Sequence, residues 1–466
     1  MKQLKKSVLL ILITFMIFSI SLVVPSFATN ETENSVINID KSDVALKDVK
    51  TESQSCVLID AKTGNIMYAK NAFDKMYPAS TTKLMTAILT LEKCQLNDVV
   101  TVSHNAIYSI PVGYTHASLK EDEELTVEQL LNVLMVPSAN DAAIALAEHI
   151  AGSVENFSVM MNEKAKELGC INTNFVNPNG IHEKDHYSCS YDLSLIGRYA
   201  MSFPDIMRIA KVRQYTLPTT NKYDKTDRIF NATNALLNDE SLNENYYPYA
   251  TGLKTGYTDA AGSCIVATAE KDDIELLAVI LYGESIDSRY NDCKNLFEYG
   301  FKNYSYMTLK SADETIDILE IDNATRETKS LDVVVKDEIK LLLKNGFDTQ
   351  KLEPVIELKE DLEAPIAENS VIGKITYTID GKTYSSDLVA GDNVIPSEFA
   401  TFIFRLCIIF LILLVLFKIL KHTGNSRPRK KSKKKIYKKN VKKKVRKNSR
   451  PGKGKGEFKF TQISNY

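Results

Sequence analysis

Short apolar runs bounded by turn residues recur along this chain, and they predict strands. Two runs close together, Gly262–Ala269 and Leu276–Leu281, are apolar enough to predict a pair of neighbouring buried strands. An earlier apolar segment, residues 56–69, is interrupted by the turn residues Lys62–Asn65, so it predicts two strands joined by a tight connection. The sequence therefore predicts sheet structure early in the chain and again after residue 260.

Three other segments have the apolar content and the end signals of helices. Pro78 is followed by Leu, Ile and Ala residues, which predicts a helix whose N-terminal end lies near Ser80. Thr126 is a typical N-cap for the apolar segment that continues to Val136. Asp192–Ser202 predicts a further helix.

From about Asn303 the pattern changes to short strands, which predicts a small antiparallel β domain. Residues 332–336 and 371–378 are two examples, and the Asp380-Gly381 pair after the second is typical of a two-residue hairpin turn. The region carries no chemical motif, so we expect a spacer or a platform for a partner.

The N-terminal segment, residues 1–28, has the pattern of a secretory signal peptide. It has lysines near its start, a largely apolar run from Val8 to Val24, and the small-x-small triplet Ser26–Ala28. An uncleaved membrane anchor is the alternative, and both interpretations place the following residues outside the membrane. Residues 29–54 are polar and predict a poorly ordered lead-in.

A second long apolar run, residues 401–420, divides the chain into two parts of opposite charge. Its two charged residues, Arg405 and Lys418, lie near its ends, and it is long enough to span a bilayer. Residues 421–466 contain 19 Lys and Arg and one Glu, a net charge of +18. Because the whole chain carries −1, the signal segment +3 and the apolar run +2, residues 29–400 carry −24.

This charge distribution predicts a single-span protein of the cell membrane. Segments rich in Lys and Arg are retained in the cytoplasm, so the acidic part is expected outside the cell and the basic tail inside. We expect the tail to lie on anionic lipid, and a nucleic-acid arm is the less favoured alternative.

Ser80 and Lys83 form the first candidate chemical pair. Residues three apart lie on one face of a helix, and a neutral amine beside a serine hydroxyl can accept its proton. The pKa of a lysine is ordinarily about 10.4, so Lys83 would need burial and nearby cations to be neutral at pH 7. The spacing is weak evidence by itself, since Ser432 and Lys435 repeat it in the basic tail.

Two more motifs could complete such a site. Ser138–Asn140 follows a proline and precedes an Ala-rich helix, so its serine and amide could relay a proton and hold a peptide. Lys254–Gly256, at the end of a predicted edge strand, could bind a carboxylate by the lysine charge and the threonine hydroxyl. Each motif is common alone, because Ser103–Asn105 and Lys62–Gly64 have the same form.

The order of the three motifs resembles that of the active-site serine penicillin-recognising enzymes. The second motif begins 58 residues after the first, and the third begins 116 residues after the second. The flanking residues narrow the resemblance, which covers about residues 55–390, to the low-molecular-mass D-alanyl-D-alanine carboxypeptidases. These flanking segments are Tyr77–Lys83, Asn177–Gly180, His186–Ser188, Asn231–Leu237 and Gly252–Thr258.

The resemblance implies roles for the first two motifs. Ser80 would be the acylated nucleophile and Lys83 the base that activates it. Ser138 would relay the proton, and Asn140 would contact the substrate amide. The family's loop often has His where Asn179 stands here, which affects only local substrate contacts.

The resemblance also implies the site of the leaving group. Lys254 and Thr255, with Gly256 beside them, would bind the carboxylate of the leaving D-alanine. Backbone N–H groups of Ser80 and Tyr257 would form the oxyanion hole.

The fold implied by the resemblance is an α/β (α+β) catalytic domain like that of penicillin-binding proteins and β-lactamases. It has a central antiparallel sheet and a helical subdomain, and a small all-β domain and a transmembrane helix follow it. The expected parts are a signal peptide (1–28), a polar lead-in (29–54), the catalytic domain (55–302), a small β-sandwich domain (303–396), the transmembrane helix (401–420) and a basic cytoplasmic tail (421–466).

The implied activity is removal of the terminal D-alanine from peptidoglycan stem pentapeptides, which limits cross-linking of the wall, with β-lactams as inhibitors. A β-lactamase is one alternative, disfavoured because no clear deacylating glutamate follows Asn140 and because a second domain and an anchor follow. A membrane-tethered penicillin sensor or scaffold is another. The complete motif set argues against a scaffold, and the short tail argues against a sensor.

Seven cysteines and six histidines show no CxxC, HExxH or other metal-ligand spacing. We therefore expect no metal and no cofactor. Scattered cysteines in a core of this size are as typical of buried thiols as of disulfides, so no disulfide is predicted.

Overall fold

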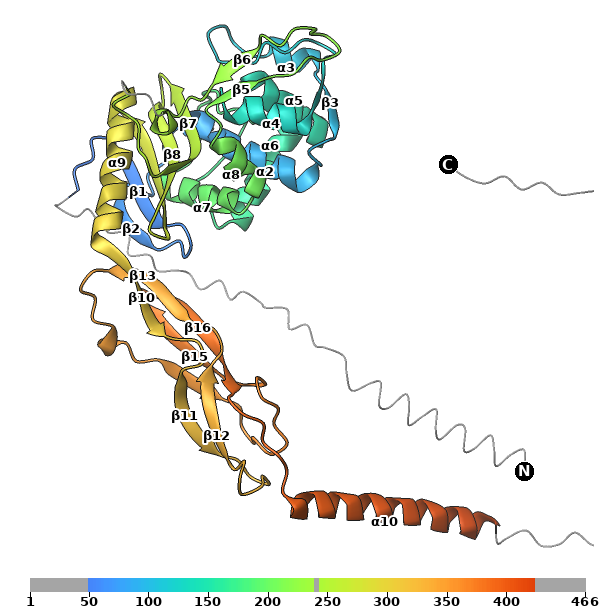
Figure 1. Ribbon diagram of the computed structural model, residues 1–466. Coiled ribbons are helices and arrows are strands. Elements are labelled where there is room, and N and C mark those ends of the chain that lie inside the picture. The colour runs from blue at the N-terminus through green and yellow to red at the C-terminus, as the bar shows by residue number, and fades with distance from the viewer. Residues whose placement is uncertain (1–48, 239–242, 424–466) are drawn as a thin grey trace, which may run out of the picture. The chain divides into compact units, whose positions relative to one another are not determined.

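The computed structural model describes residues 49–238 and 243–423 (Figure 1). The predicted signal peptide, most of the polar lead-in and nearly all of the basic tail lie outside the described residues. The chain divides into two compact units, Met1–Ile395 and Pro396–Tyr466, which are described separately below.

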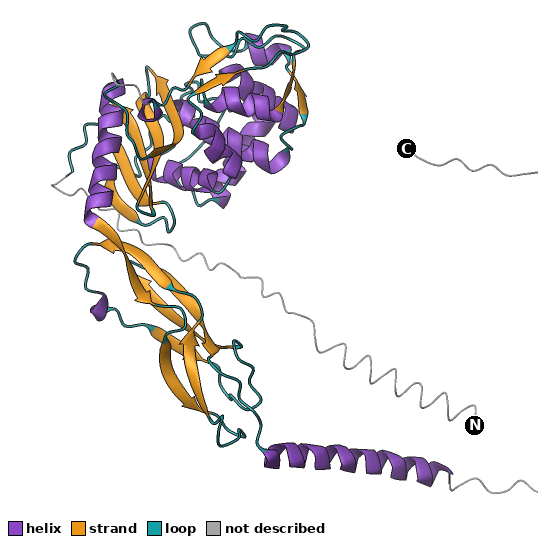
Figure 2. Ribbon diagram, viewed as in Figure 1, coloured by secondary structure: helices purple, strands orange, loops and turns teal. Residues whose placement is uncertain are grey.

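In the part of the first unit before residue 304, a five-stranded antiparallel sheet lies between helices (Figure 2). Its strand order, β2-β1-β9-β8-β7, places β1 beside β9, which follows it by more than 200 residues. This agrees with the strands predicted from the apolar runs. The strands are β1 (Ser55–Asp60), β2 (Ile66–Lys70), β7 (Ala250–Thr258), β8 (Gly262–Lys271) and β9 (Ile274–Gly283).

The central strands are apolar at successive positions because helices cover both faces of the sheet (Figure 1). In β1, Cys56 and Leu58 face the core that α9 (Ile286–Asn303) completes, whereas Val57 and Ile59 face the helical region. Successive side chains of a strand point to opposite faces, so both sets are buried. The helices of the helical region are α2 (Lys83–Lys93), α3 (His104–Tyr108), α4 (Val127–Met135), α5 (Asn140–Ala151), α6 (Val154–Glu167), α7 (Ser190–Met201) and α8 (Pro204–Ala210).

Local sequence signals set several of these boundaries. Thr126 caps α4 through a capping box with Gln129, as its position predicted. The helix predicted after Pro78 begins differently: Ser80 lies in a 3₁₀ turn, η1 (Ala79–Thr82), and Lys83 is the first residue of α2. Such turns are frequent at helix N-termini because they satisfy end groups with tighter hydrogen bonds. The short elements that connect the helices are β3 (Val99–Thr101) with β4 (Glu124–Thr126), β5 (Gln214–Thr216) with β6 (Ile229–Asn231), and η2 (Ala235–Leu237).

After α9 the chain is β-rich, and it has a separate core. A five-stranded sheet has the order β11-β12-β16-β15-β14, and β10 pairs with β13. The predicted hairpin turn is confirmed, since Asp380 and Gly381 have φ of 49° and 75° between β15 and β16. The elements are β10 (Tyr304–Lys310), β11 (Thr315–Glu320), β12 (Ser330–Val335), β13 (Ile339–Lys344), η3 (Thr349–Lys351), β14 (Val355–Leu358), β15 (Val371–Ile379) and β16 (Lys382–Ala390).

The second unit contains one long helix, α10 (Glu398–Thr423). Its segment Thr401–Ile419 has a mean hydropathy of 2.8 and is long and apolar enough to cross a membrane. None of that segment is buried within the structure, which suits contact with lipid.

Candidate active site

Lys83 is at the centre of a hydrogen-bonded group that joins two of the three motifs. Its side chain is fully buried, Nζ lies 2.8 Å from Ser80 Oγ, and it donates to Asn140 Oδ1 at 2.8 Å. A third bond, 2.7 Å long, goes to the main-chain oxygen of Asn179. The structure therefore places the amine of Lys83 against the candidate nucleophile and holds it from two other sides.

Burial and a second cation make the protonated form of Lys83 unfavourable. Loss of hydration lowers the pKa of Lys83 well below its usual range, and the charge of Lys254 lowers it further. The buried carboxylate of Asp141 opposes this shift in the pKa. Lys83 therefore has the two features expected of a lysine base, which are burial and a nearby cation.

The amide of Asn140 is held in one orientation. Its Nδ2 donates to the main-chain oxygen of Thr115 at 2.8 Å, and its backbone N–H donates to the same oxygen at 3.0 Å. The amide oxygen is thereby turned toward Lys83. Asp141, the next residue, accepts backbone N–H bonds from Ala117 at 2.9 Å and Leu119 at 3.2 Å, which anchors the segment that carries Thr115.

Lys254 and Thr255 lie on the edge strand β7, as predicted, but in its middle and not at its end. The strand continues because Thr258 still pairs with Gly262 at the hairpin to β8. Lys254 is buried, and its Nζ donates to the main-chain oxygen of Thr255 at 2.9 Å. Burial and the nearby Arg289 guanidinium lower the pKa of Lys254 to about 7.

Gly256 allows β7 to approach the turn that carries Ser80. A Cβ atom at this position would lie 2.9 Å from the backbone nitrogen of Ser80 and 3.1 Å from Ala79 Cβ. Only a residue without a side chain fits such a close approach. Arg289 supports the same stretch of strand, since its Nη1 donates to the main-chain oxygen of Gly256 at 3.1 Å.

Ser138 is placed nearby but is not part of this hydrogen-bonded group. It lies in the connection between α4 and α5 with φ of 70° and is 7% exposed. Among residues 49–238 and 243–423, its hydroxyl has no hydrogen-bond partner. Tyr257, whose backbone N–H the family resemblance assigned to the oxyanion hole, follows Gly256 and has an exposed side chain.

A buried histidine secures the loop that carries Asn179. His186 accepts the backbone N–H of Val176 at Nδ1 (3.1 Å), and its Nε2 lies 2.8 Å from Thr82 Oγ1. Nε2 therefore carries the proton and donates to the threonine. Burial and the neighbouring charges of His182 and Lys83 lower the pKa of His186 to about 3, so it is a neutral connection at physiological pH.

Several of these supporting groups carry no recognisable sequence signal. The sequence drew attention to Asn179 only for substrate contacts, whereas its main-chain oxygen is what contacts Lys83. Thr115 also acts through a main-chain oxygen, which is present at every position of every chain. Asp141 and Arg289 act through side chains, but no motif marks them.

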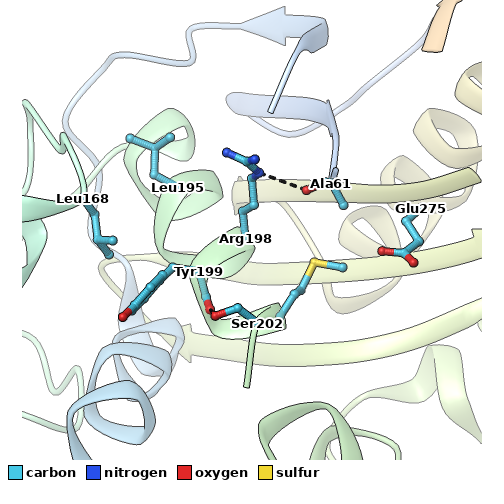
Figure 3. A pocket seen from close by; sticks show the side chains of 8 residues that line it. Ala61, Leu168, Leu195, Arg198, Tyr199, Ser202 and Glu275 are labelled. Carbon is cyan, nitrogen blue, oxygen red and sulfur yellow. Dashed lines mark hydrogen bonds between the residues drawn. The ribbon is translucent and has the colours of Figure 1, made fainter. Parts of the chain in front are cut away.

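A cavity of about 460 Å³ lies elsewhere, and none of the motif residues lines it (Figure 3). Arg198 at its wall donates to the main-chain oxygens of Ala61 (2.9 Å) and Lys62 (2.6 Å). Its guanidinium is therefore engaged in holding the β1–β2 turn. The residues that line the cavity are Ala61, Leu168, Leu195, Arg198, Tyr199, Met201, Ser202 and Glu275.

Two family models match this chain. Residues 41–285 match the model described as D-alanyl-D-alanine carboxypeptidase, and residues 304–395 match that of the penicillin-binding protein 5 C-terminal domain. The D-alanyl-D-alanine carboxypeptidase DacF of Bacillus subtilis (strain 168) is 31% identical over 360 residues, which are 76% of this chain and 89% of the relative. DacC of Escherichia coli (strain K12), also a D-alanyl-D-alanine carboxypeptidase, is 30% identical over 361 residues, 74% of this chain and 84% of the relative.

A solved structure extends the similarity to three dimensions. Penicillin-binding protein 5 from Haemophilus influenzae superposes with a TM-score of 0.60 at 28% sequence identity, covering 75% of this chain and 100% of that one. The fold class expected from the sequence, an α/β catalytic domain followed by a β-rich domain, is thereby confirmed.

Proposed function

This chain belongs to the D-alanyl-D-alanine carboxypeptidase family, and from that premise we propose that it removes the terminal D-alanine of peptidoglycan stem pentapeptides through an acyl-enzyme on Ser80. The observation that carries the assignment is the 2.8 Å contact between Lys83 Nζ and Ser80 Oγ in a buried site. An amine so placed can take the serine proton if it is neutral.

The partners of Lys83 suit a neutral amine with its lone pair toward Ser80. The oxygens of Asn140 and Asn179 can only accept, so they take the two N–H groups of a neutral amine. Ser80, whose Oγ lies 2.8 Å from Nζ, is the one partner that can donate a proton, so a neutral Lys83 would turn its lone pair toward the Ser80 hydroxyl. Asn140 and Asn179 thus orient the base as well as hold it.

The reaction then follows in two steps. Lys83 takes the hydroxyl proton while Ser80 Oγ bonds to the carbonyl carbon of the penultimate D-alanine. The carbon–nitrogen bond breaks, the amine of the terminal D-alanine receives the proton through Ser138, and an ester on Ser80 remains. Water attacks this ester and the carbon–oxygen bond to Ser80 breaks. One proton of the water passes through Lys83 to Ser80 Oγ, the other is lost to solvent, and the shortened peptide leaves as a carboxylate.

The region around β7 is suited to the two anionic groups of the substrate. Backbone N–H groups of Ser80 and Tyr257 would stabilise the oxyanion, and the close approach at Gly256 brings these two segments together. Lys254 and Thr255 would bind the carboxylate of the leaving D-alanine. An arriving carboxylate favours the protonated form of Lys254, whose pKa of about 7 leaves it partly neutral beforehand. A β-lactam carries a carboxylate of the same kind, which accounts for inhibition.

We place the catalytic domain outside the cell and the basic tail in the cytoplasm, with α10 as the anchor. The apolar segment Thr401–Ile419 supports the anchor, and the charges of −24 and +18 on its two sides support the orientation. The tail would lie on anionic lipid. Protease added outside intact, wall-stripped cells should destroy the Ser80 domain and spare a tag after Tyr466. Loss of the tag would show the opposite orientation.

The activity is tested by measuring free D-alanine released from a synthetic pentapeptide that ends in D-Ala-D-Ala. The full-length chain in detergent should release it, and Ser80→Ala should not. Fluorescent penicillin should label the wild type and leave the variant unlabelled. Release or labelling that persists in Ser80→Ala would show that the nucleophile is a different residue.

A further inference from the structure

A second threonine lies against the threonine of the Lys254–Gly256 motif. Thr233 Oγ1 is 2.6 Å from Thr255 Oγ1, a short distance for two hydroxyl groups. Thr255 is 4% exposed, whereas Thr233 lies on the surface. The two residues are 22 positions apart, Thr255 on β7 and Thr233 in the connection between β6 and η2, so tertiary structure alone makes this pair.

The segment around Thr233 is held on three sides. The backbone N–H of Thr233 donates to the main-chain oxygen of Val136 at the end of α4, at 3.2 Å. The hydroxyl of Tyr290 on α9 donates to the main-chain oxygen of Thr233 at 2.9 Å. The next residue, Asn234, donates from Nδ2 to the main-chain oxygen of Gly252 on β7 at 3.3 Å. Thr233 is therefore fixed relative to β7 and to the end of α4, two residues before Ser138.

The direction of the hydrogen bond between Thr233 and Thr255 determines whether Thr255 can donate to a ligand. Each hydroxyl has one proton, and the bond between the two oxygens uses only one of these two protons. Within the described part of the chain, neither hydroxyl has another partner. If Thr233 is the donor, the proton of Thr255 is free to point elsewhere. If Thr255 is the donor, its proton is already used.

Burial favours Thr233 as the donor. The buried oxygen of Thr255 needs a hydrogen-bond donor from the protein, because unpaired buried oxygens are unfavourable. The exposed oxygen of Thr233 can accept from water instead. With Thr233 donating, the oxygen of Thr255 is satisfied and its own proton remains available for a ligand.

We propose that Thr233 is a positioning residue for carboxylate recognition. Its hydroxyl donates to Thr255 and thereby commits the Thr255 proton to one oxygen of the carboxylate, while Lys254 binds the other. The inference rests on the proposed function, because it assigns the Thr255 site to the carboxylate of the terminal D-alanine or of a β-lactam. Thr233 lies outside the three motifs, and its role would be to orient the hydroxyl of Thr255 within the third motif.

The test compares Thr233→Val with a matched control, both in the full-length chain. Thr251, which lies on β7 as Thr255 does, donates to Thr268 at 2.8 Å. Thr251→Val therefore removes a hydrogen bond between two threonines at a place that does not involve the motif residues. The readout is the acylation rate with penicillin divided by the rate with its carboxyl methyl ester. This ratio should fall about tenfold in Thr233→Val, the effect of losing one hydrogen bond to a charged group. It should be unchanged in Thr251→Val and restored in Thr233→Ser.

A double-mutant cycle decides whether Thr233 acts through Thr255. Thr233→Val should add nothing to Thr255→Val, since the proton that Thr233 orients is then absent. Additive losses would show that Thr233 binds the carboxylate itself, and a wild-type ratio in Thr233→Val would show that it has no role. Either outcome overturns the proposal.

D-alanine release by the wild type is measured in parallel, because it tests the proposed function and does not depend on Thr233.

Discussion

The same three residues, Lys-Thr-Gly, occur twice in this chain and have different surroundings. Lys62–Gly64 forms the turn between β1 and β2, where the lysine is exposed and donates to the main-chain oxygen of Asp273 at 2.9 Å. Lys254–Gly256 lies in the middle of β7, where the lysine is buried beside Arg289 and Lys83. One triplet is a surface turn and the other lines the candidate active site.

The two glycines are needed for opposite reasons. Gly64 has φ of 72°, a backbone conformation that disfavours residues with a side chain. Gly256 has no such conformation, but a side chain there would meet the backbone of Ser80. Gly64 stabilises a turn, whereas Gly256 allows two segments of the candidate site to lie close together. The same triplet can therefore have different roles, which depend on its environment in the fold.

Around the first triplet, the contacts are those of a domain junction. Lys382 Nζ donates to Gly64 O and Asn65 Oδ1, both at 2.9 Å, and the Tyr384 hydroxyl donates to Asn65 Oδ1 at 2.8 Å. Both residues come from the β-rich region after α9. The turn therefore joins two parts of the first unit.

The largest loss of acylation is expected on replacing Lys83, a buried lysine in contact with Ser80, in contrast to the exposed Lys62. Lys83→Arg keeps the positive charge, but arginine does not deprotonate near neutral pH. Penicillin acylation should fall by about 10²- to 10⁴-fold, the usual contribution of a general base. Lys62→Arg should acylate like the wild type. If Lys83→Arg stayed within about tenfold of the wild type, less than about 1.4 kcal/mol, Lys83 would not be the base.

The second prediction concerns replacement of the lysine in each triplet by methionine, an uncharged residue of similar length. Lys254→Met removes the cation that would bind the substrate carboxylate, so kcat/KM for the pentapeptide should fall about 100-fold. Lys62→Met should have no measurable effect on kcat/KM. Equal losses in both variants would contradict the distinction between the triplets.

The third prediction separates stability from activity at the two glycines. Gly256→Ala places a Cβ 2.9 Å from the Ser80 nitrogen, so the nucleophile must shift and acylation should fall about tenfold or more. Gly64→Ala should lower the free energy of unfolding by about 1 kcal/mol through its left-handed conformation and leave acylation unchanged. Thermal unfolding and penicillin acylation, measured on both variants, check the two effects. A loss of acylation in Gly64→Ala would undermine this assignment.

The smallest expected effect is a pH dependence that the first triplet does not share. Burial and the charge of Arg289 lower the pKa of Lys254 to about 7. Only its protonated form binds a carboxylate strongly, so kcat/KM should fall about fivefold from pH 7 to pH 8. At low pH, kcat/KM should fall as Lys83 becomes protonated. The alkaline decline should disappear in Lys254→Met and persist in Lys62→Met. A decline of equal size in Lys254→Met would assign it to another group.

Much of the fold followed from local signals in the sequence. Apolar runs identified β8 and β9, Thr126 identified the start of α4, and Asp380-Gly381 identified the turn between β15 and β16. The apolar run at Thr401–Ile419 identified the candidate span. Each of these features depends on residues adjacent in the chain, so spacing and residue type are sufficient to predict it.

Residue types in order also predicted the candidate site, because nucleophile, amine and hydroxyl must be specific side chains. Ser80, Lys83 and Asn140 meet in the structure, and Lys254 lies close enough to lower the pKa of Lys83. Tertiary structure alone shows which copy of a repeated motif lies in the candidate site, since burial and neighbouring charges arise from the packing of distant segments. The supporting bonds from the Asn179 main-chain oxygen, and from Thr233 to Thr255, were likewise decided only there. Main-chain oxygens are the same in every residue, and contacts between distant segments depend on how the whole chain packs.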